Sequence, residues 1–146
     1  VLATLRIADS IERTGDLVTE SCEIGKTLYP TPIEQRFRRL LELMSRTAEA
    51  NTRAAVESYT NSDLAEAAVV FDLDSQLDRL ASSLARECAI AEPDTEPGVV
   101  AAVALIGHCY ERIGDNAVTI GERVQFALTG KHPQRRTRYA GQASSS

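Results

Sequence analysis

Two stretches of the chain repeat each other. Residues 5–23 read LRIADSIERTGDLVTESCE, and residues 104–122 read ALIGHCYERIGDNAVTIGE. Aligned without a gap at an offset of 99 residues, they share an isoleucine, the run ERxGD and a closing glutamate. Agreement over this length predicts that a helical unit has been duplicated. The sequence starts without Met and inside an apolar pattern, so we expect a fragment in which one unit has lost its first helices.

The rest of the chain is divided by a few turn-forming residues. They leave four long segments, at about 1–29, 33–60, 62–91 and 97–129. Apolar residues recur in them at intervals of three and four, as at Phe37, Leu40, Leu41 and Met44, and no stretch alternates with the period of a strand. The sequence therefore predicts an all-α fold, an antiparallel bundle of four long helices. Ser62 is the predicted N-cap of the third helix.

Composition excludes several classes of protein. Hydrophobic residues make up 43% and charged residues 25%, as in globular proteins, and the longest uncharged apolar stretch is too short to span a bilayer. Three cysteines without CxxC spacing indicate a reducing compartment, so we expect a cytoplasmic protein without direct membrane insertion. Zinc-finger, nucleophile-elbow and phosphate-loop motifs are absent.

Charge is unevenly distributed along the chain. The segment after Gly130 contains four Lys or Arg residues and no Asp or Glu, so the rest of the chain is strongly acidic. An acidic surface disfavours nucleic acid as a partner. Residues 131–146 are predicted to be a flexible basic, Ser-rich tail. It would be either a solvated terminus or a contact for an acidic partner.

Acidic pairs are the strongest chemical signal. Glu111 and Asp115 are four residues apart in ERxGD, and Asp74 and Asp78 have the same spacing in FDLDSQLD. Residues four apart share one helix face, and like charges there are unfavourable unless a cation neutralises them. If the third and fourth helices pack together, these four carboxylates are a candidate metal site. The alternative interpretation is a solvated acidic face paired with nearby arginines.

Glycines accompany the acids on the last helix. Gly107, Gly114 and Gly121 are seven apart, which predicts close approach of a neighbouring helix. The matching positions in residues 5–23 are also small: Ala8, Gly15 and Cys22. His108 is expected on the solvated side and Cys109 in the core, so neither indicates catalysis.

These motifs resemble the PhoU family of phosphate-signalling regulators. YERIGDNAVTIGERVQFALTG at 110–130 is similar to the family's C-terminal helix, IADSIERTGDL at 7–17 to the same helix of its first repeat, and FDLDSQLDRL at 71–80 to its aspartate-bearing helix. The resemblance implies two three-helix repeats. Residues 1–29 would be the last helix of a truncated first repeat, and residues 30–130 a complete second repeat.

The resemblance also implies metal ligands. The acidic pairs that bind metal clusters in some family members correspond here to Glu12 with Asp16, to Asp74 with Asp78 and to Glu111 with Asp115. A site at the first pair would lack its facing half. The metal would be divalent or a transition metal, such as iron, zinc, nickel, manganese or magnesium. The resemblance leaves the role of Asn116 open, because the family commonly has His after the motif Asp.

The function implied by the resemblance is regulatory and not enzymatic. Such proteins are negative regulators of the phosphate-starvation response that contact a phosphate ABC transporter ATPase and a sensor histidine kinase. Arg36, Arg38 and Arg39 are expected to be exposed and are candidate contact residues, the alternative being a solvated helix face. We expect a homo-oligomer because the first helix lacks the rest of its unit. Two alternatives are a PhoU-like domain of a larger phosphate transporter or channel and a carboxylate-bridged metalloenzyme. The second requires Glu-x-x-His pairs, which the sequence lacks.

Overall fold

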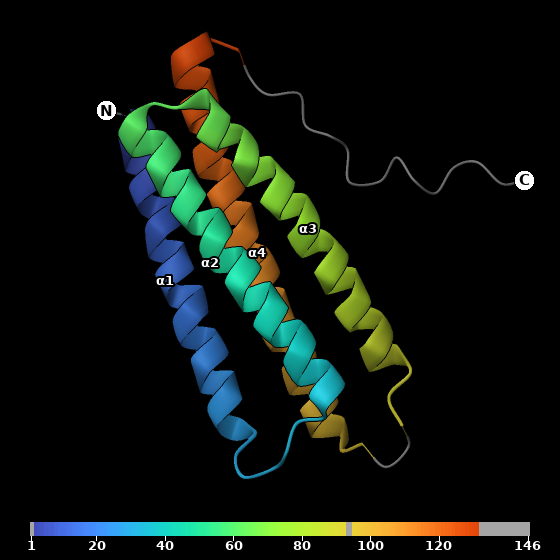
Figure 1. Ribbon diagram of the computed structural model, residues 1–146. Coiled ribbons are helices and arrows are strands. Elements are labelled where there is room, and N and C mark those ends of the chain that lie inside the picture. Colours follow the sequence, from blue (N-terminus) through green and yellow to red (C-terminus); the bar gives the residue numbers. More distant parts are fainter. Residues whose placement is uncertain (1, 93–94, 132–146) are drawn as a thin grey trace, which may run out of the picture.

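The chain folds into four long helices joined by short connections. The computed structural model describes residues 2–92 and 95–131, which contain α1 (Leu2–Thr27), α2 (Gln35–Asn61), α3 (Leu64–Ala89) and α4 (Pro97–Thr129) (Figure 1). Successive helices run in opposite directions, so the predicted all-α antiparallel bundle is confirmed. Apart from Lys131, the predicted tail lies outside the described residues.

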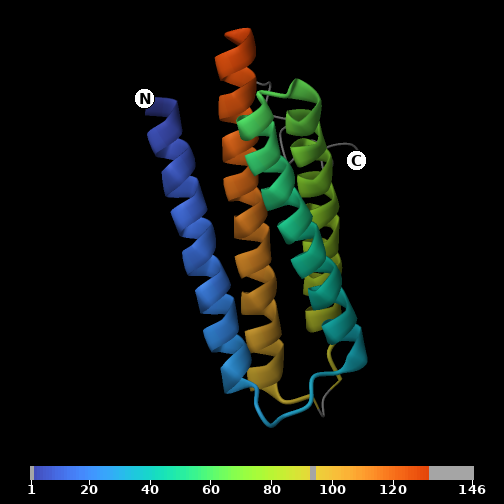
Figure 2. The same cartoon turned by 60° about the vertical axis from the view of Figure 1, so that its left-hand side comes forward.

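The last helix is the centre of the structure. α4 packs against α1, α2 and α3, and α2 also packs against α3. Within the described part of the chain, α1 packs against α4 and lies at the edge of the molecule (Figure 2). Its contact with α2 is a 3.3 Å hydrogen bond between the hydroxyls of Thr4 and Tyr59. The molecule is therefore a three-helix bundle with a fourth helix on one side.

The two repeated segments pack against each other. Ile7 of α1 belongs to the same buried cluster as Ile120 and Val124 near the end of α4. Leu28, just after α1, belongs to a second cluster with Val99 near the start of α4. The copies of the repeat therefore lie side by side and antiparallel (Figure 1).

One predicted helix cap is wrong by one residue. Ser62 adopts a left-handed backbone, with φ of 52°, and ends α2 instead of starting α3. The N-cap is Asp63, whose side chain accepts a 2.7 Å hydrogen bond from the backbone N–H of Ala65. An N-cap needs an extended backbone, which a left-handed residue cannot supply. Pro97 in the first turn of α4 and Gly130 at its end agree with prediction.

A polar cluster holds one end of the bundle together. Thr95 donates a 2.6 Å hydrogen bond to Glu34, and Arg36 donates to both Glu34 and Glu87, at 2.8 and 3.2 Å. The bond from Thr95, and then those from Arg36, hold the pKa of Glu34 below its usual value. The cluster joins the start of α2, the end of α3 and the connection to α4. Arg36 is half-buried and ion-paired here, so its predicted exposure is wrong.

The glycine stripe of α4 is where α3 approaches most closely. Each glycine lies against an aliphatic side chain of α3, and the pairs are Gly107 with Leu84, Gly114 with Leu77, and Gly121 with Val70. A Cβ on Gly114 would stand 2.7 Å from Cδ2 of Leu77. Leu77 has no exposed surface and little room to move. The predicted close approach of a neighbouring helix is confirmed.

The effect of alanine should differ between the two copies of ERxGD. We expect Gly114→Ala to lower the free energy of unfolding by about 1 kcal/mol, because overpacking against Leu77 outweighs the gain in helix propensity. Gly15→Ala is the control, since no atom lies within 4 Å of its Cβ position, and it should stabilise the protein by up to about 1 kcal/mol. Urea denaturation measures both. Equal stabilisation by the two substitutions would contradict the close contact.

Candidate functional site

The acidic pairs of α3 and α4 lie on two helices that pack together. Asp74 and Asp78 on α3, and Glu111 and Asp115 on α4, are all half-buried. Glu122, two turns beyond Asp115, is half-buried as well. Carboxylates in this position are partly shielded from water, which strengthens their interaction with any cation nearby.

The glycine of ERxGD makes room for one of these carboxylates. Oδ1 of Asp74 lies 3.1 Å from the position that a Cβ on Gly114 would occupy. Such a distance is possible only because residue 114 has no side chain. Asp74 therefore lies against the backbone of α4, one residue before Asp115.

The acidic pair of α1 is placed differently. Glu12 and Asp16 are exposed, and α1 packs against α4 alone within the described residues. No second helix of the described chain brings carboxylates to this pair. The structure thus separates the six predicted ligands into four at the contact of α3 with α4 and two on an open face.

The described side chains do not form a ready metal centre. Across residues 2–92 and 95–131, no three His, Cys, Asp or Glu side chains are grouped so that they could hold a metal ion. Carboxylate oxygens suit hard cations, so the donor type is appropriate. A cation would have to draw the four carboxylates together by side-chain rotation.

A buried amide, which the sequence analysis did not single out, lies next to this site. Asn51 on α2 has no exposed surface, and neither polar atom of its side chain has a hydrogen-bond partner among the residues that the structure describes. Its Nδ2 atom lies 3.7 Å from the same Cβ position of Gly114 that Asp74 approaches. Its burial could have been predicted from the sequence, because residue 51 follows the same helical spacing as the apolar residues Met44, Ala48 and Ala55.

Other polar residues of α4 have structural contacts. Asn116 donates a 3.3 Å hydrogen bond to the hydroxyl of Thr14 and so links α4 to α1. His108 is exposed, with Nδ1 3.6 Å from a carboxylate oxygen of Glu111. Cys109 is buried, and that burial raises the pKa of its thiol, as expected for a core residue rather than a nucleophile.

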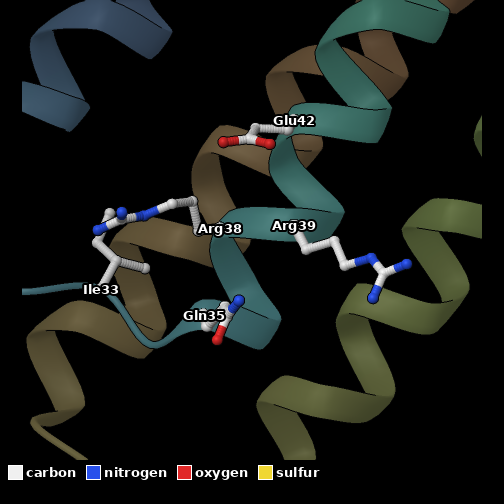
Figure 3. A pocket seen from close by; sticks show the side chains of 5 residues that line it. All are labelled: Ile33, Gln35, Arg38, Arg39 and Glu42. Atoms are coloured by element: carbon white, nitrogen blue, oxygen red, sulfur yellow. The ribbon is translucent and has the colours of Figure 1, made fainter.

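A second polar surface surrounds the first turns of α2. Ile33, Gln35, Arg38, Arg39 and Glu42 line a pocket of about 520 Å³ (Figure 3). The side chains of Arg38 and Arg39 extend to opposite sides of α2, so they do not converge on one small anion. Neither arginine has an ion pair in the described part of the chain. They are therefore available to a larger partner.

The outer face of α1 is exposed, whereas α3 packs against the equivalent face of α4. Ala8, Ile11, Gly15, Val18 and Cys22 form an exposed line that we call the α1 stripe, and Ile11 and Val18 are each 47% exposed. Three of its members correspond in the repeat to the glycines that receive α3. This face has the small residues needed for close packing but no helix against it among the described residues.

Fold and motifs together define a class of protein. It is an all-helical protein whose duplicated ERxGD helices pack antiparallel and whose α3 and α4 carry half-buried acidic pairs. The family model of the PhoU domain matches residues 41–124, and the chain belongs to the PhoU domain family. The resemblance seen in the sequence is thereby confirmed. No helix in the described ranges has the length and apolar character needed to cross a membrane.

Curated proteins that are similar to this chain are named as PhoU homologs in several bacteria. The chain is 28% identical over 133 residues to the phosphate-specific transport system accessory protein PhoU homolog of Caulobacter vibrioides, covering 89% of this chain and 57% of that protein. It is 30% identical over 136 residues to PhoU homolog 1 of Mycobacterium bovis, covering 91% and 61%. For the Deinococcus radiodurans homolog the identity is 27% over 132 residues, covering 89% and 62%. The chain thus spans about 60% of the length of these relatives.

Proposed function

We propose that this protein is an accessory regulator of phosphate transport that acts in the cytoplasm by contact with other proteins. The PhoU domain match carries this proposal, and the relatives named as accessory proteins of the phosphate-specific transport system support it. A phosphate ABC transporter ATPase and a sensor histidine kinase are its proposed partners. The role is repression of the phosphate-starvation response, without catalysis.

The basic surface of α2 is the proposed contact with a partner. Arg38 and Arg39 are exposed guanidinium groups on a chain with net charge −5. Because they extend to opposite sides of α2, they fit an acidic protein segment that crosses the helix better than a single anion. Long charged side chains of this kind set partner choice and association rate more than affinity.

The four half-buried carboxylates are the proposed metal site. Asp74, Asp78, Glu111 and Asp115 supply carboxylate oxygens from two packed helices, the type of ligand that hard divalent cations prefer. Rotation of the side chains toward the cation would complete the site. Glu12 and Asp16 lack a facing helix in the described chain and serve as a natural comparison.

The α1 stripe supports a homo-oligomer. In an antiparallel pair of α1 helices from two copies, Gly15 of one copy would lie opposite Val18 of the other, and Cys22 opposite Ile11. Large side chains would then meet small ones, as they do where α3 meets α4. A twofold contact of this kind uses the same patch on both copies.

The regulatory role can be tested in the organism that encodes the chain. Deletion of the gene should raise expression of a phosphate-starvation reporter at high phosphate, and the intact gene should restore repression. The Arg38→Glu, Arg39→Glu variant should not restore it, because the partner contact is reversed in charge. Arg46→Glu, a charge change at another exposed position of α2, is the control. An unchanged reporter in the deletion strain refutes the role, and full repression by the double variant refutes the contact surface.

Metal content can be measured by inductively coupled plasma mass spectrometry after loading and gel filtration. We expect a divalent or transition metal in the parent protein and none in the Asp74→Ala, Asp115→Ala variant. Circular dichroism should show unchanged helix content, since both side chains are only half-buried. The Glu12→Ala, Asp16→Ala variant should keep the metal. Equal metal content in all three proteins would rule out the assigned site.

Oligomerisation can be followed by light scattering at micromolar concentration. We expect a dimer for the parent protein and a monomer for Val18→Arg, which places a charge in the α1 stripe. Glu20→Arg, on the opposite side of α1, should remain dimeric. Thiol labelling of Cys22 should slow as protein concentration rises. A monomeric parent protein would disprove this interface.

A further inference from the structure

The buried amide of Asn51 marks a polar site at the meeting point of three helices. Asn51 comes from α2, Asp74 from α3 and Gly114 from α4. The amide nitrogen of Asn51 and the carboxylate oxygen of Asp74 lie 3.7 and 3.1 Å from one point, the Cβ position of Gly114. Asn51 is completely buried, and neither of its polar side-chain atoms has a hydrogen-bond partner among residues 2–92 and 95–131.

An amide in this state is costly unless something else satisfies it. A buried polar group without a partner loses its bonds to water and gains nothing in return. Most of the buried core is apolar, so an apolar residue at position 51 would avoid that cost. The asparagine is therefore best explained by a ligand that completes its hydrogen bonds.

The chemistry of the two orphaned atoms selects the ligand. Nδ2 needs an acceptor and Oδ1 needs a donor. A metal cation would satisfy only the oxygen, and an anion only the nitrogen. Water both accepts and donates, and its remaining proton suits the nearby carboxylate of Asp74.

We propose that a buried water bridges the side chains of Asn51 and Asp74, and that this hydrated contact positions the Asp74 carboxylate against α4. Asn51 is a positioning residue in this arrangement. Gly114 contributes as well, because a Cβ there would press on the Asp74 carboxylate. The Asp74 carboxylate of the acidic site is thus held from the core side by Asn51, which is fully buried.

The contact would affect metal binding, and this part rests on the proposed metal site. Residues that orient a ligating carboxylate through hydrogen bonds change metal affinity by about tenfold or more when they are replaced. Asn51→Leu replaces both polar atoms by methyl groups and keeps the number of side-chain heavy atoms. We expect it to leave the fold intact and to weaken metal binding about tenfold.

The water itself can be tested without metal. A crystal structure of the whole chain should show ordered density within hydrogen-bond distance of the Asn51 amide and the Asp74 carboxylate. In nuclear magnetic resonance spectra of the metal-free protein, Asp74→Asn should shift the side-chain amide signal of Asn51. Asp78→Asn, the same change one turn along α3, should leave that signal in place.

The outcomes separate this proposal from the proposed metal site. Water density together with a response to Asp74→Asn alone supports the contact, whether or not the parent protein binds metal. A dry core, or an amide signal that ignores Asp74→Asn, overturns it. If the parent protein binds metal and Asn51→Leu binds it equally well, the positioning role is overturned. If the parent protein binds none, the metal site fails and the water contact is decided by the other two measurements.

Discussion

The close approach of α3 to α4 is the constraint on which the rest of the molecule depends. Three glycines at seven-residue spacing let Leu84, Leu77 and Val70 lie directly on the backbone of α4. Packing at this distance removes much apolar surface from water, which compensates for the poor helix propensity of glycine. It also brings the Asp74 carboxylate of α3 against the backbone of α4. The same packing therefore sets both the core and the position of this acidic residue.

Sequence periodicity was enough to predict the helices, but not every contact between them. Spacing of apolar residues depends on the helical repeat alone, so four helices and the glycine contact were predictable. The cap at Ser62 was missed because Ser62 and Asp63 both favour N-caps, and only the backbone shows which one is extended. Arg36 was assigned to the surface because its partner Glu87 lies 51 residues away.

The candidate site shows the same limit. Spacing placed the acidic pairs on one face of each helix, and helix packing then brought α3 and α4 together. Residue spacing could not show that Asp74 lies against Gly114, or that Asn51 approaches that position from a third helix. Those facts depend on the rotation of each helix about its own axis, which tertiary packing decides. A polar residue within an apolar stripe was the only local sign.

The attachment of α1 has a consequence for how the structure opens. α1 packs on α4 and meets α2 through one hydrogen bond, so most of its contacts can be lost without disturbing those among α2, α3 and α4. Local unfolding follows such boundaries, so α1 is expected to open before the other helices. Its departure would uncover α4 side chains that share buried clusters with α1, such as Ile113 with Leu17 and Ile120 with Ile7. One copy of the repeated helix, α1, thus covers the other copy, α4, and can separate from it.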